Sequence, residues 1–205
     1  VTTIMVLLRG AYYATDAVAA GAWPRERLMG REISGKVLGL VGFGSIARET
    51  AVRAKALGMT IIAADPFVAA DDPAWARIGA RRVSLGALVA EADAVSLHVP
   101  LTAETRNLID ARRLAAMKPG AVLVNAARGG VVDEAALAEA LRAGTLAGAA
   151  LDVFDVEPLK AGSPLTGCPN LILTPHIAGV TVESNVRVSS VTAANVRRVL
   201  QERRR

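Results

Sequence analysis

The sequence predicts an α/β domain with a doubly wound parallel sheet and helices on both faces. Short aliphatic runs alternate with segments of helical periodicity, an order typical of strand–helix–strand units. Of the 205 residues, 52% are hydrophobic but only 3% are aromatic, which suits a sheet of Ala, Val, Leu and Ile buried on both faces. Because no interior linker interrupts it, residues 36–205 are expected to form one domain, with residues 1–35 as an appendage.

The first half of the chain starts with helical periodicity and continues as alternating strands and helices. Apolar residues recur at helical spacing after Val1, so residues 2–20 are predicted to be helical, and a looser segment follows to residue 35. Residues 65–81 lack a regular pattern. The remaining elements expected here are strands at 36–41, 60–64 and 82–84 and helices at 45–57 and 85–91.

The second half alternates more regularly. Asp110 and Asp133 each precede a helical segment and can cap its N-terminus, while Gly120 and Gly144 follow the two segments and can end them. The elements expected are strands at 94–99, 121–125, 147–153 and 171–174 and helices at 111–117, 134–143 and 181–201.

A glycine-rich turn follows the expected strand at 36–41 and opens the next helix. Its sequence is Gly42-Phe-Gly44-Ser-Ile-Ala47, the pattern in which the glycines allow a tight turn and close approach of a pyrophosphate. The phosphates would meet the free N–H groups of the helix N-terminus. Asp65 ends the second strand, where a carboxylate accepts hydrogen bonds from ribose hydroxyls and repels the extra phosphate of NADP. The turn therefore predicts a Rossmann domain that binds NAD, although an Asp before Pro66 could also simply start a turn.

Charge and composition argue against several other classes of protein. The net charge is +5, but basic residues are scattered among acidic ones, and the run at 203–205 is better explained as a solvated helix end than as a nucleic-acid site. The sequence contains neither a long uncharged apolar run nor a signal-peptide pattern, so no membrane partner is predicted. The single Cys168 fits a reducing, cytoplasmic compartment. No metal site is predicted.

Three blocks with an ionisable residue follow later strands, at the sheet edge where open α/β sheets bind ligands. They are Asn125-Ala-Ala-Arg-Gly-Gly130, Leu151-Asp-Val-Phe-Asp-Val-Glu-Pro158 and Thr174-Pro-His-Ile-Ala-Gly179. Singly, Arg128 could be a surface arginine, Glu157 a loop acid and His176 a structural histidine. Together they suit the reduction of a 2-keto acid, with a His as proton donor, a carboxylate that orients its ring, and an Arg fork for the substrate carboxylate.

These four motifs, in this order, resemble those of the D-isomer-specific 2-hydroxyacid dehydrogenases. The resemblance implies that Arg128 binds and activates the substrate, that His176 is the acid/base and that Glu157 is its partner. Pyrophosphate contacts are implied for Ser45 and Ile46, beside Gly42 and Gly44, and a ribose contact for Asp65. It also implies that Val99 and Pro100 lie by the adenosine half, and that the nicotinamide half meets Ala126, Ala127, Arg128, Asp152, His176, Ile177, Ala178 and Gly179.

The family resemblance also implies features beyond the NAD site. A second, flavodoxin-like substrate domain is expected in such enzymes and would be absent from this chain. Residues 1–35 correspond to the hinge helix and dimerisation arm, so a homodimer is expected, with Tyr12, Tyr13, Trp23 and Leu28 as its apolar contacts. The 3-phosphoglycerate dehydrogenase branch, which includes sulfolactate-type enzymes, is the most similar, but the sequence does not identify the 2-hydroxy acid.

Two other functions are compatible with the same motifs. The chain could be a non-catalytic, NAD(H)-sensing module similar to the corepressors of this superfamily, which can retain the catalytic trio. It could also be an assembly domain that acts through its N-terminal helix. The lack of long extensions favours the enzyme over the corepressor.

Overall fold

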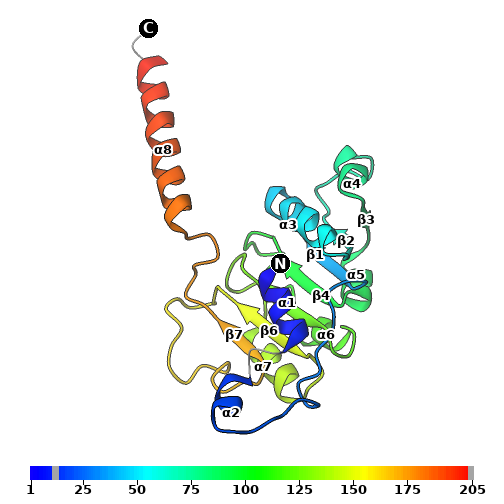
Figure 1. Ribbon diagram of the computed structural model, residues 1–205. Helices are drawn as coiled ribbons and strands as arrows, with labels where there is room; N and C mark the ends of the chain where they lie inside the picture. The colour runs from blue at the N-terminus through cyan, green and yellow to red at the C-terminus, as the bar shows by residue number, and fades with distance from the viewer. Residues whose placement is uncertain (11–13, 203–205) are drawn as a thin grey trace.

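A computed structural model describes residues 1–10 and 14–202, and its centre is one parallel sheet (Figure 1). Its seven strands lie in the order β3-β2-β1-β4-β5-β6-β7. They are β1 (Val37–Val41), β2 (Thr60–Ala64), β3 (Ala80–Arg82), β4 (Ala94–Leu97), β5 (Val122–Asn125), β6 (Gly148–Leu151) and β7 (Leu171–Leu173). The chain moves outward from β1 to β3 and then returns to β4, which confirms the predicted doubly wound Rossmann fold.

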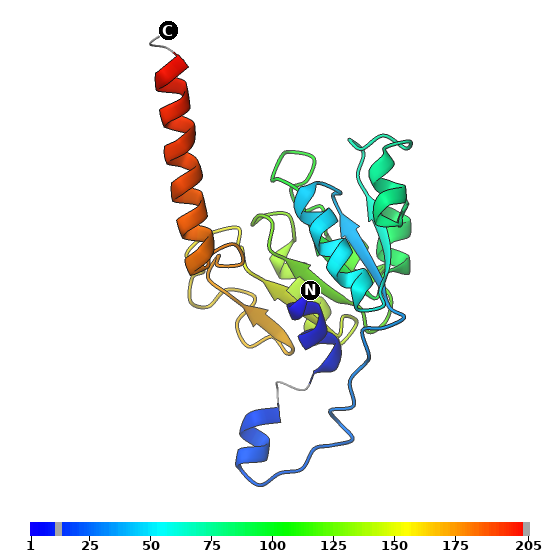
Figure 2. The same ribbon diagram turned by 45° about the horizontal axis from the view of Figure 1, so that its top comes forward.

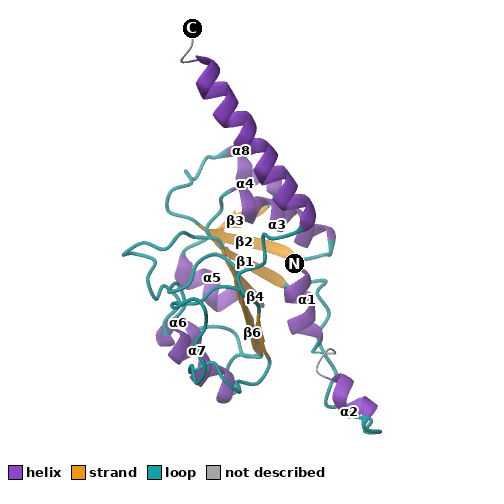
Figure 3. Cartoon of the chain, turned by 90° about the vertical axis from the view of Figure 1, so that its left-hand side faces the viewer, coloured by secondary structure: helices purple, strands orange, loops and turns teal. Residues whose placement is uncertain are grey.

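Helices cover both faces of the sheet (Figure 3). One face carries α1 (Thr2–Arg9), α3 (Ser45–Ala56) and α4 (Pro73–Ile78), and the other carries α5 (Leu85–Glu91), α6 (Ala111–Ala115) and α7 (Glu134–Arg142). Successive strand residues point to opposite faces, so Leu38 and Leu40 of β1 enter the α1–α3–α4 core while Val41 enters the other. The sheet is therefore buried on both faces, as the composition predicts.

Strand register brings the carboxyl ends of the strands to one edge. Val41 pairs with Ala64 of β2 and with Leu97 of β4, and the row continues through β5 and β6 to β7. The residues that follow these ends are therefore neighbours along one edge, at the switch point between β1 and β4. All the candidate site residues come from this edge.

The N-terminal segment differs from the single helical stretch predicted for residues 2–20. Gly10 adopts a left-handed conformation with φ of 62° and ends α1, and a separate short helix, α2 (Thr15–Ala19), follows without a buried residue. The segment then returns to α1, where a Cβ on Gly30 would lie 2.0 Å from the Arg9 carbonyl oxygen. Figure 2 shows this arm extending below α1.

Strands β4 and β6 and helix α6 end two residues earlier than predicted, and the segment between β2 and α5 differs more. The irregular stretch at 65–81 contains α4, which Asp72 caps by accepting a hydrogen bond from Ala74 N at 2.7 Å and which Gly79 ends. Strand β3 begins at Ala80 rather than at residue 82, because the buried Ala80 continues directly from that helix end.

The last helix, α8 (Val182–Glu202), has no buried residue and projects from the domain (Figure 1). None of the helices within residues 1–10 and 14–202 is long and apolar enough to cross a membrane.

Candidate active site

The glycine-rich turn connects β1 to α3 in a conformation that requires glycine. Gly42 has φ of 91°, and a Cβ there would lie 2.6 Å from the His98 carbonyl oxygen. A Cβ on Gly44 would meet nothing within 4 Å, so this backbone is open to a ligand. Gly44 is also the N-cap of α3 and provides no side-chain acceptor, which leaves the amides of the first turn free for an anion.

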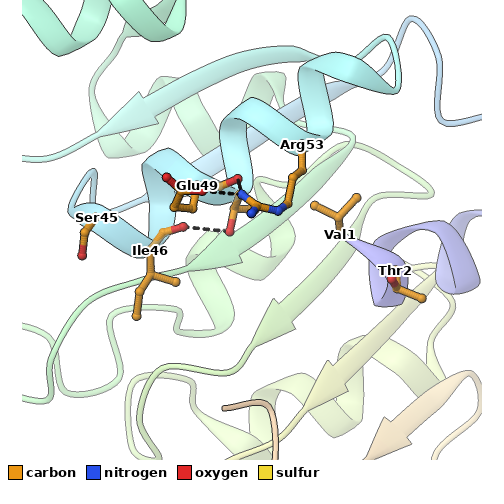
Figure 4. Close-up of a pocket in the computed structure, with 7 residues that line it drawn as sticks. Val1, Thr2, Ser45, Ile46, Glu49 and Arg53 are labelled. Carbon is orange, nitrogen blue, oxygen red and sulfur yellow. Dashed lines mark hydrogen bonds and ion pairs between the residues drawn. The ribbon is translucent and has the colours of Figure 1, made fainter. Parts of the chain in front are cut away.

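A cavity of about 420 Å³ lies beside the start of α3 (Figure 4). Ser45 and Ile46 line it from α3, and Thr2 of α1 and its N-cap Val1 line it from the other side. The predicted pyrophosphate residues Ser45 and Ile46 are both exposed and therefore accessible to a cofactor.

Asp65 follows β2 and contacts the glycine-rich turn directly. Its Oδ2 accepts a hydrogen bond from Phe43 N at 2.7 Å, and its Oδ1 accepts one from Phe67 N at 2.8 Å. A carboxylate has about four acceptor positions, so acceptor capacity is left for ribose hydroxyls. Its bond to the turn is a role that the sequence did not predict.

Val99 and Pro100 follow β4 on the other side of the turn. A Cβ on Gly42 would lie 3.1 Å from Val99 Cγ1, so Val99 adjoins the turn. The Pro100 carbonyl oxygen accepts a hydrogen bond from Thr105 Oγ1 at 2.6 Å, which fixes the loop after β4.

Asp152 follows β6 and organises the loop that carries the histidine. Its carboxylate accepts hydrogen bonds from Thr174 Oγ1 at 2.6 Å and from the amides of Ile177 and Ala178 at 2.8 Å each. Burial raises the pKa of Asp152, but the bonds from Thr174, Ala178 and Ile177 and the charge of His176 outweigh it, so the pKa lies below its usual value. An ionised Asp152 therefore fixes the Thr174 side chain before His176 and the backbone after it.

The Glu157 carboxylate lies next to the His176 ring. Glu157 Oε2 is 2.9 Å from His176 Nδ1, while Glu157 Oε1 accepts a hydrogen bond from Phe154 N at 3.0 Å. The bond to His176 and then the bond from Phe154 lower the pKa of Glu157. The histidine side chain is 54% exposed, so Nε2, the ring nitrogen that Glu157 does not engage, can reach a substrate.

Arg128 lies in a loop that the buried Asn125 shapes. Asn125 Oδ1 accepts a hydrogen bond from Ala127 N and its Nδ2 donates to the Arg128 carbonyl oxygen, each at 3.0 Å. The exposed guanidinium donates to the Ala127 carbonyl oxygen at 2.6 Å, and within the described residues no hydrogen bond or ion pair joins it to His176 or Glu157. The two loops nevertheless pack closely, since a Cβ on Gly129 would lie 1.7 Å from the Phe154 carbonyl oxygen.

Comparison with known proteins identifies the family. A family model described as "D-isomer specific 2-hydroxyacid dehydrogenase, NAD binding domain" matches residues 1–178. The chain belongs to the D-isomer specific 2-hydroxyacid dehydrogenases. This confirms the resemblance inferred from the four motifs, and NAD is the cofactor of the matched domain.

Relatives of this dehydrogenase domain are longer than the chain. A protein named (S)-sulfolactate dehydrogenase from Chromohalobacter salexigens is 59% identical over 199 residues, which cover 97% of this chain and 64% of the relative. A D-3-phosphoglycerate dehydrogenase from Archaeoglobus fulgidus is 43% identical over 183 residues, which cover 89% of this chain and 34% of that one. The chain therefore spans less than two thirds of these relatives.

Solved structures share the fold of this dehydrogenase domain. The crystal structure of D-lactate dehydrogenase from Aquifex aeolicus complexed with NAD and lactic acid matches with a TM-score of 0.87 at 32% identity. The match covers 98% of this chain and 64% of that chain.

Two features of this dehydrogenase domain were not predicted from its sequence. A second cavity, of about 590 Å³, lies beside His176 and Glu157, with Phe154, Leu159 and Leu173 among its apolar walls. The other is His98, which follows β4 and lies 3.0 Å, at Nε2, from Ser96 Oγ. The cavity forms where residues 154–159 pack near residues 173–176, which local pattern does not predict, whereas a His directly after a buried strand is a usable signal for the second feature.

Proposed function

We propose that this chain is the NAD-binding and catalytic part of a dehydrogenase that transfers a hydride between NAD and C2 of a D-2-hydroxy acid. The observation that carries the proposal is the 2.9 Å pair of His176 Nδ1 and Glu157 Oε2 at the edge of an NAD-binding sheet. Sulfolactate and 3-phosphoglycerate, the substrates in the names of the two relatives above, are both 2-hydroxy acids with a second anionic group at C3. We propose an acid of this class as the substrate.

The chemistry of the side chains supports this reaction. When bound, NAD would supply the hydride acceptor for oxidation at C2, and NADH would supply the hydride donor for reduction. His176 Nε2 takes the proton of the C2 hydroxyl, because Nδ1 already contacts Glu157, and the ionised Glu157 stabilises the resulting imidazolium. Arg128 would turn from the Ala127 carbonyl oxygen to pair with the substrate carboxylate through its guanidinium fork.

The cofactor contacts in this proposal follow the sheet edge. The uncapped first turn of α3 and the open backbone at Gly44 suit a pyrophosphate, and the carboxylate of Asp65 suits the adenosine ribose. We assign the adenosine half to Val99 and Pro100, and the nicotinamide half to Ala126, Ala127, Arg128, Asp152 and residues 176–179. The carboxylate of Asp65 favours NAD over NADP.

We also propose that residues 1–35 serve as hinge helix and dimerisation arm for the domain at 36–205. In the longer relatives, the remaining length would form a second domain that closes over the site. Closure excludes water and holds the substrate in position, so this chain alone should bind NAD but turn over substrate slowly.

A chimera tests the proposal. The chain replaces the corresponding 199 residues of the Chromohalobacter salexigens relative, and NADH absorbance is followed with sulfolactate, 3-phosphoglycerate and lactate. We expect turnover of at least one of the two acids with a second anionic group, and much slower turnover by the chain alone. A chimera that folds and binds NAD but oxidises none of the acids would contradict the proposal, and equal rates with and without the added segments would contradict the need for a second domain.

A further inference from the structure

Phe43, the residue between the two glycines of the cofactor turn, makes contacts through its amide, its carbonyl oxygen and its ring. Phe43 is fully buried, its amide donates to Asp65 Oδ2 at 2.7 Å, and its carbonyl oxygen accepts from Arg48 Nε at 2.9 Å. Its ring stacks on Trp75 with a centroid distance of 4.2 Å and an interplanar angle of 3°. Arg48 Cζ lies over the same ring, 5.2 Å from its centroid.

This cluster of Phe43, Arg48 and Trp75 connects the turn to α4. Trp75 is a buried residue of α4, and its Nε1 donates to the Ala69 carbonyl oxygen at 2.8 Å. Arg48 Nη2 also lies 3.5 Å from Oδ2 of Asp72, the residue that caps α4. The short helix that the sequence did not predict therefore forms the support behind the cofactor turn.

Holding Phe43 in place should affect cofactor affinity, because the glycines on both sides of it are flexible. Gly42 and Gly44 have more conformational freedom than other residues, so a Gly-x-Gly turn that became ordered only on binding would lose entropy at that step. A turn that is ordered beforehand avoids this loss, and its ligand binds more tightly without any additional contact. The stacked ring and two backbone bonds of Phe43 fix the residue that the two glycines flank.

We propose that Trp75 and Arg48 are positioning residues for the cofactor's pyrophosphate: they hold the Gly42–Gly44 turn in its binding conformation through Phe43 and touch no cofactor themselves. The proposal rests on the binding of NAD and is independent of whether the proposed reaction occurs. It applies to ligands that contain a pyrophosphate, and adenosine, which has none, should be unaffected.

The test compares variants of Trp75. Trp75→Leu removes the stacked ring and should weaken the binding of NAD and of ADP-ribose by roughly tenfold in calorimetric titration, while adenosine binding, followed by NMR, stays unchanged. Trp75→Phe restores an aromatic ring and should restore most of the affinity. Leu137→Ala, a buried change in α7 on the opposite face of the sheet, is the control for a general loss of stability.

Hydrogen exchange gives a second readout that needs no ligand. The Phe43 amide of the cofactor-free Trp75→Leu protein should exchange faster than in the unchanged protein, while the amides of β5 keep their protection. Arg48→Lys retains the positive charge but loses the planar group over the ring, so it should also weaken NAD binding.

Several results would overturn the proposal. NAD and ADP-ribose affinity unchanged in Trp75→Leu, an equal loss for adenosine, or an equal loss in Leu137→Ala would each show that Trp75 is only a core residue. Full affinity in Arg48→Lys would show that the guanidinium over the Phe43 ring does not hold the turn, and would remove Arg48 from the proposal. If Trp75→Leu does not fold, the NAD affinities of Trp75→Phe and Arg48→Lys test the proposal instead. Failure to oxidise any 2-hydroxy acid would contradict the proposed function but not this proposal.

Discussion

The Asp65 carboxylate accepts hydrogen bonds from two backbone amides, those of Phe43 and Phe67, at 2.7 and 2.8 Å. From its place after β2, the sequence predicts only a contact with the cofactor ribose. Because the amide of Phe43 belongs to the cofactor turn, Asp65 also stabilises the conformation of that turn. The Asp65 side chain thus contributes both to the preference for NAD over NADP and to the ordered conformation of the glycine-rich turn.

Replacing Asp65 should therefore change both cofactor affinity and cofactor choice. In Asp65→Ala, NAD affinity should fall by about tenfold or more because a ribose acceptor and a bond to the turn are lost together. The preference for NAD over NADP should narrow, since the repelling charge is gone. Calorimetric titration of both cofactors measures each effect, and NADP binding as tight as NAD binding in the unchanged protein would contradict the role of Asp65.

His98 should make the stability of the domain depend on pH. Burial lowers the pKa of His98 from 6.5 to about 4. The folded state therefore disfavours the charged form, so the stability is complete above pH 6.5 and falls as the pH drops towards 4, by up to about 3 kcal/mol.

Urea unfolding between pH 7 and pH 4 measures this dependence. His98→Gln, which has no titrating group, should show a smaller loss of unfolding free energy over this range. Equal losses in the two proteins would show that other groups cause the acid sensitivity.

Among the elements, the strands were predicted better than the short helices. Strand β2 has the expected bounds, because buried runs of Ile and Ala are a strong local signal. Helix α4 was not predicted, although Asp72-Pro73 at its start and Gly79 after its end are typical helix-boundary residues. The helix is only six residues long, and packing against Phe43 and α3 stabilises it more than its own helix propensity does.

The loop that follows β5 should tolerate no side chain at Gly129. A Cβ there would lie 1.7 Å from the Phe154 carbonyl oxygen, so Gly129→Ala must displace one of the loops that carry Arg128 and Glu157. We expect the free energy of unfolding to fall by at least about 2 kcal/mol and NAD-dependent turnover of the chimera to fall as well.

Gly86 in α5 provides the matched control for that substitution. A Cβ on Gly86 would meet nothing within 4 Å, so Gly86→Ala should raise the free energy of unfolding, by up to about 1 kcal/mol. Denaturant unfolding of both variants checks the pair, and a neutral Gly129→Ala would contradict the close packing of the two loops.

For the whole molecule, the alternation of strands and helices was sufficient to predict the sheet, because consecutive βαβ units are right-handed and wind in a restricted set of orders. It also predicted that Arg128, Glu157 and His176 follow strand ends. The contacts between these blocks, such as Thr174 to Asp152, join residues far apart in sequence and were not predictable from local pattern. The catalytic roles of the trio stay predictions.

The exposed arm predicts self-association. Trp23 and Met29 are 79% and 80% exposed, and an apolar surface of this kind is typical of an interface. The predicted contact Leu28 is half-buried, while Tyr12 and Tyr13 lie outside the described residues. Light scattering at high micromolar concentration should show a dimer, and Trp23→Ala with Met29→Ala should shift it towards monomer, whereas Val52→Ala on α3 should not. A monomer in the unchanged chain would contradict a homodimer.

The most direct test of the account compares two carboxylates of one loop in the active chimera. Glu157→Gln removes the charge beside His176, and Asp155→Asn makes the same isosteric change two residues away, where the carboxylate faces Arg106 at 3.1 Å. The rate of NADH formation and the affinity for NAD are measured for both variants and for His176→Ala. We predict that His176→Ala lowers turnover by about 10²–10⁴-fold, that Glu157→Gln lowers it substantially and that Asp155→Asn does not, with NAD affinity nearly unchanged in all three. Full turnover without the His176 imidazole would show that this histidine is not the acid/base and would contradict the account.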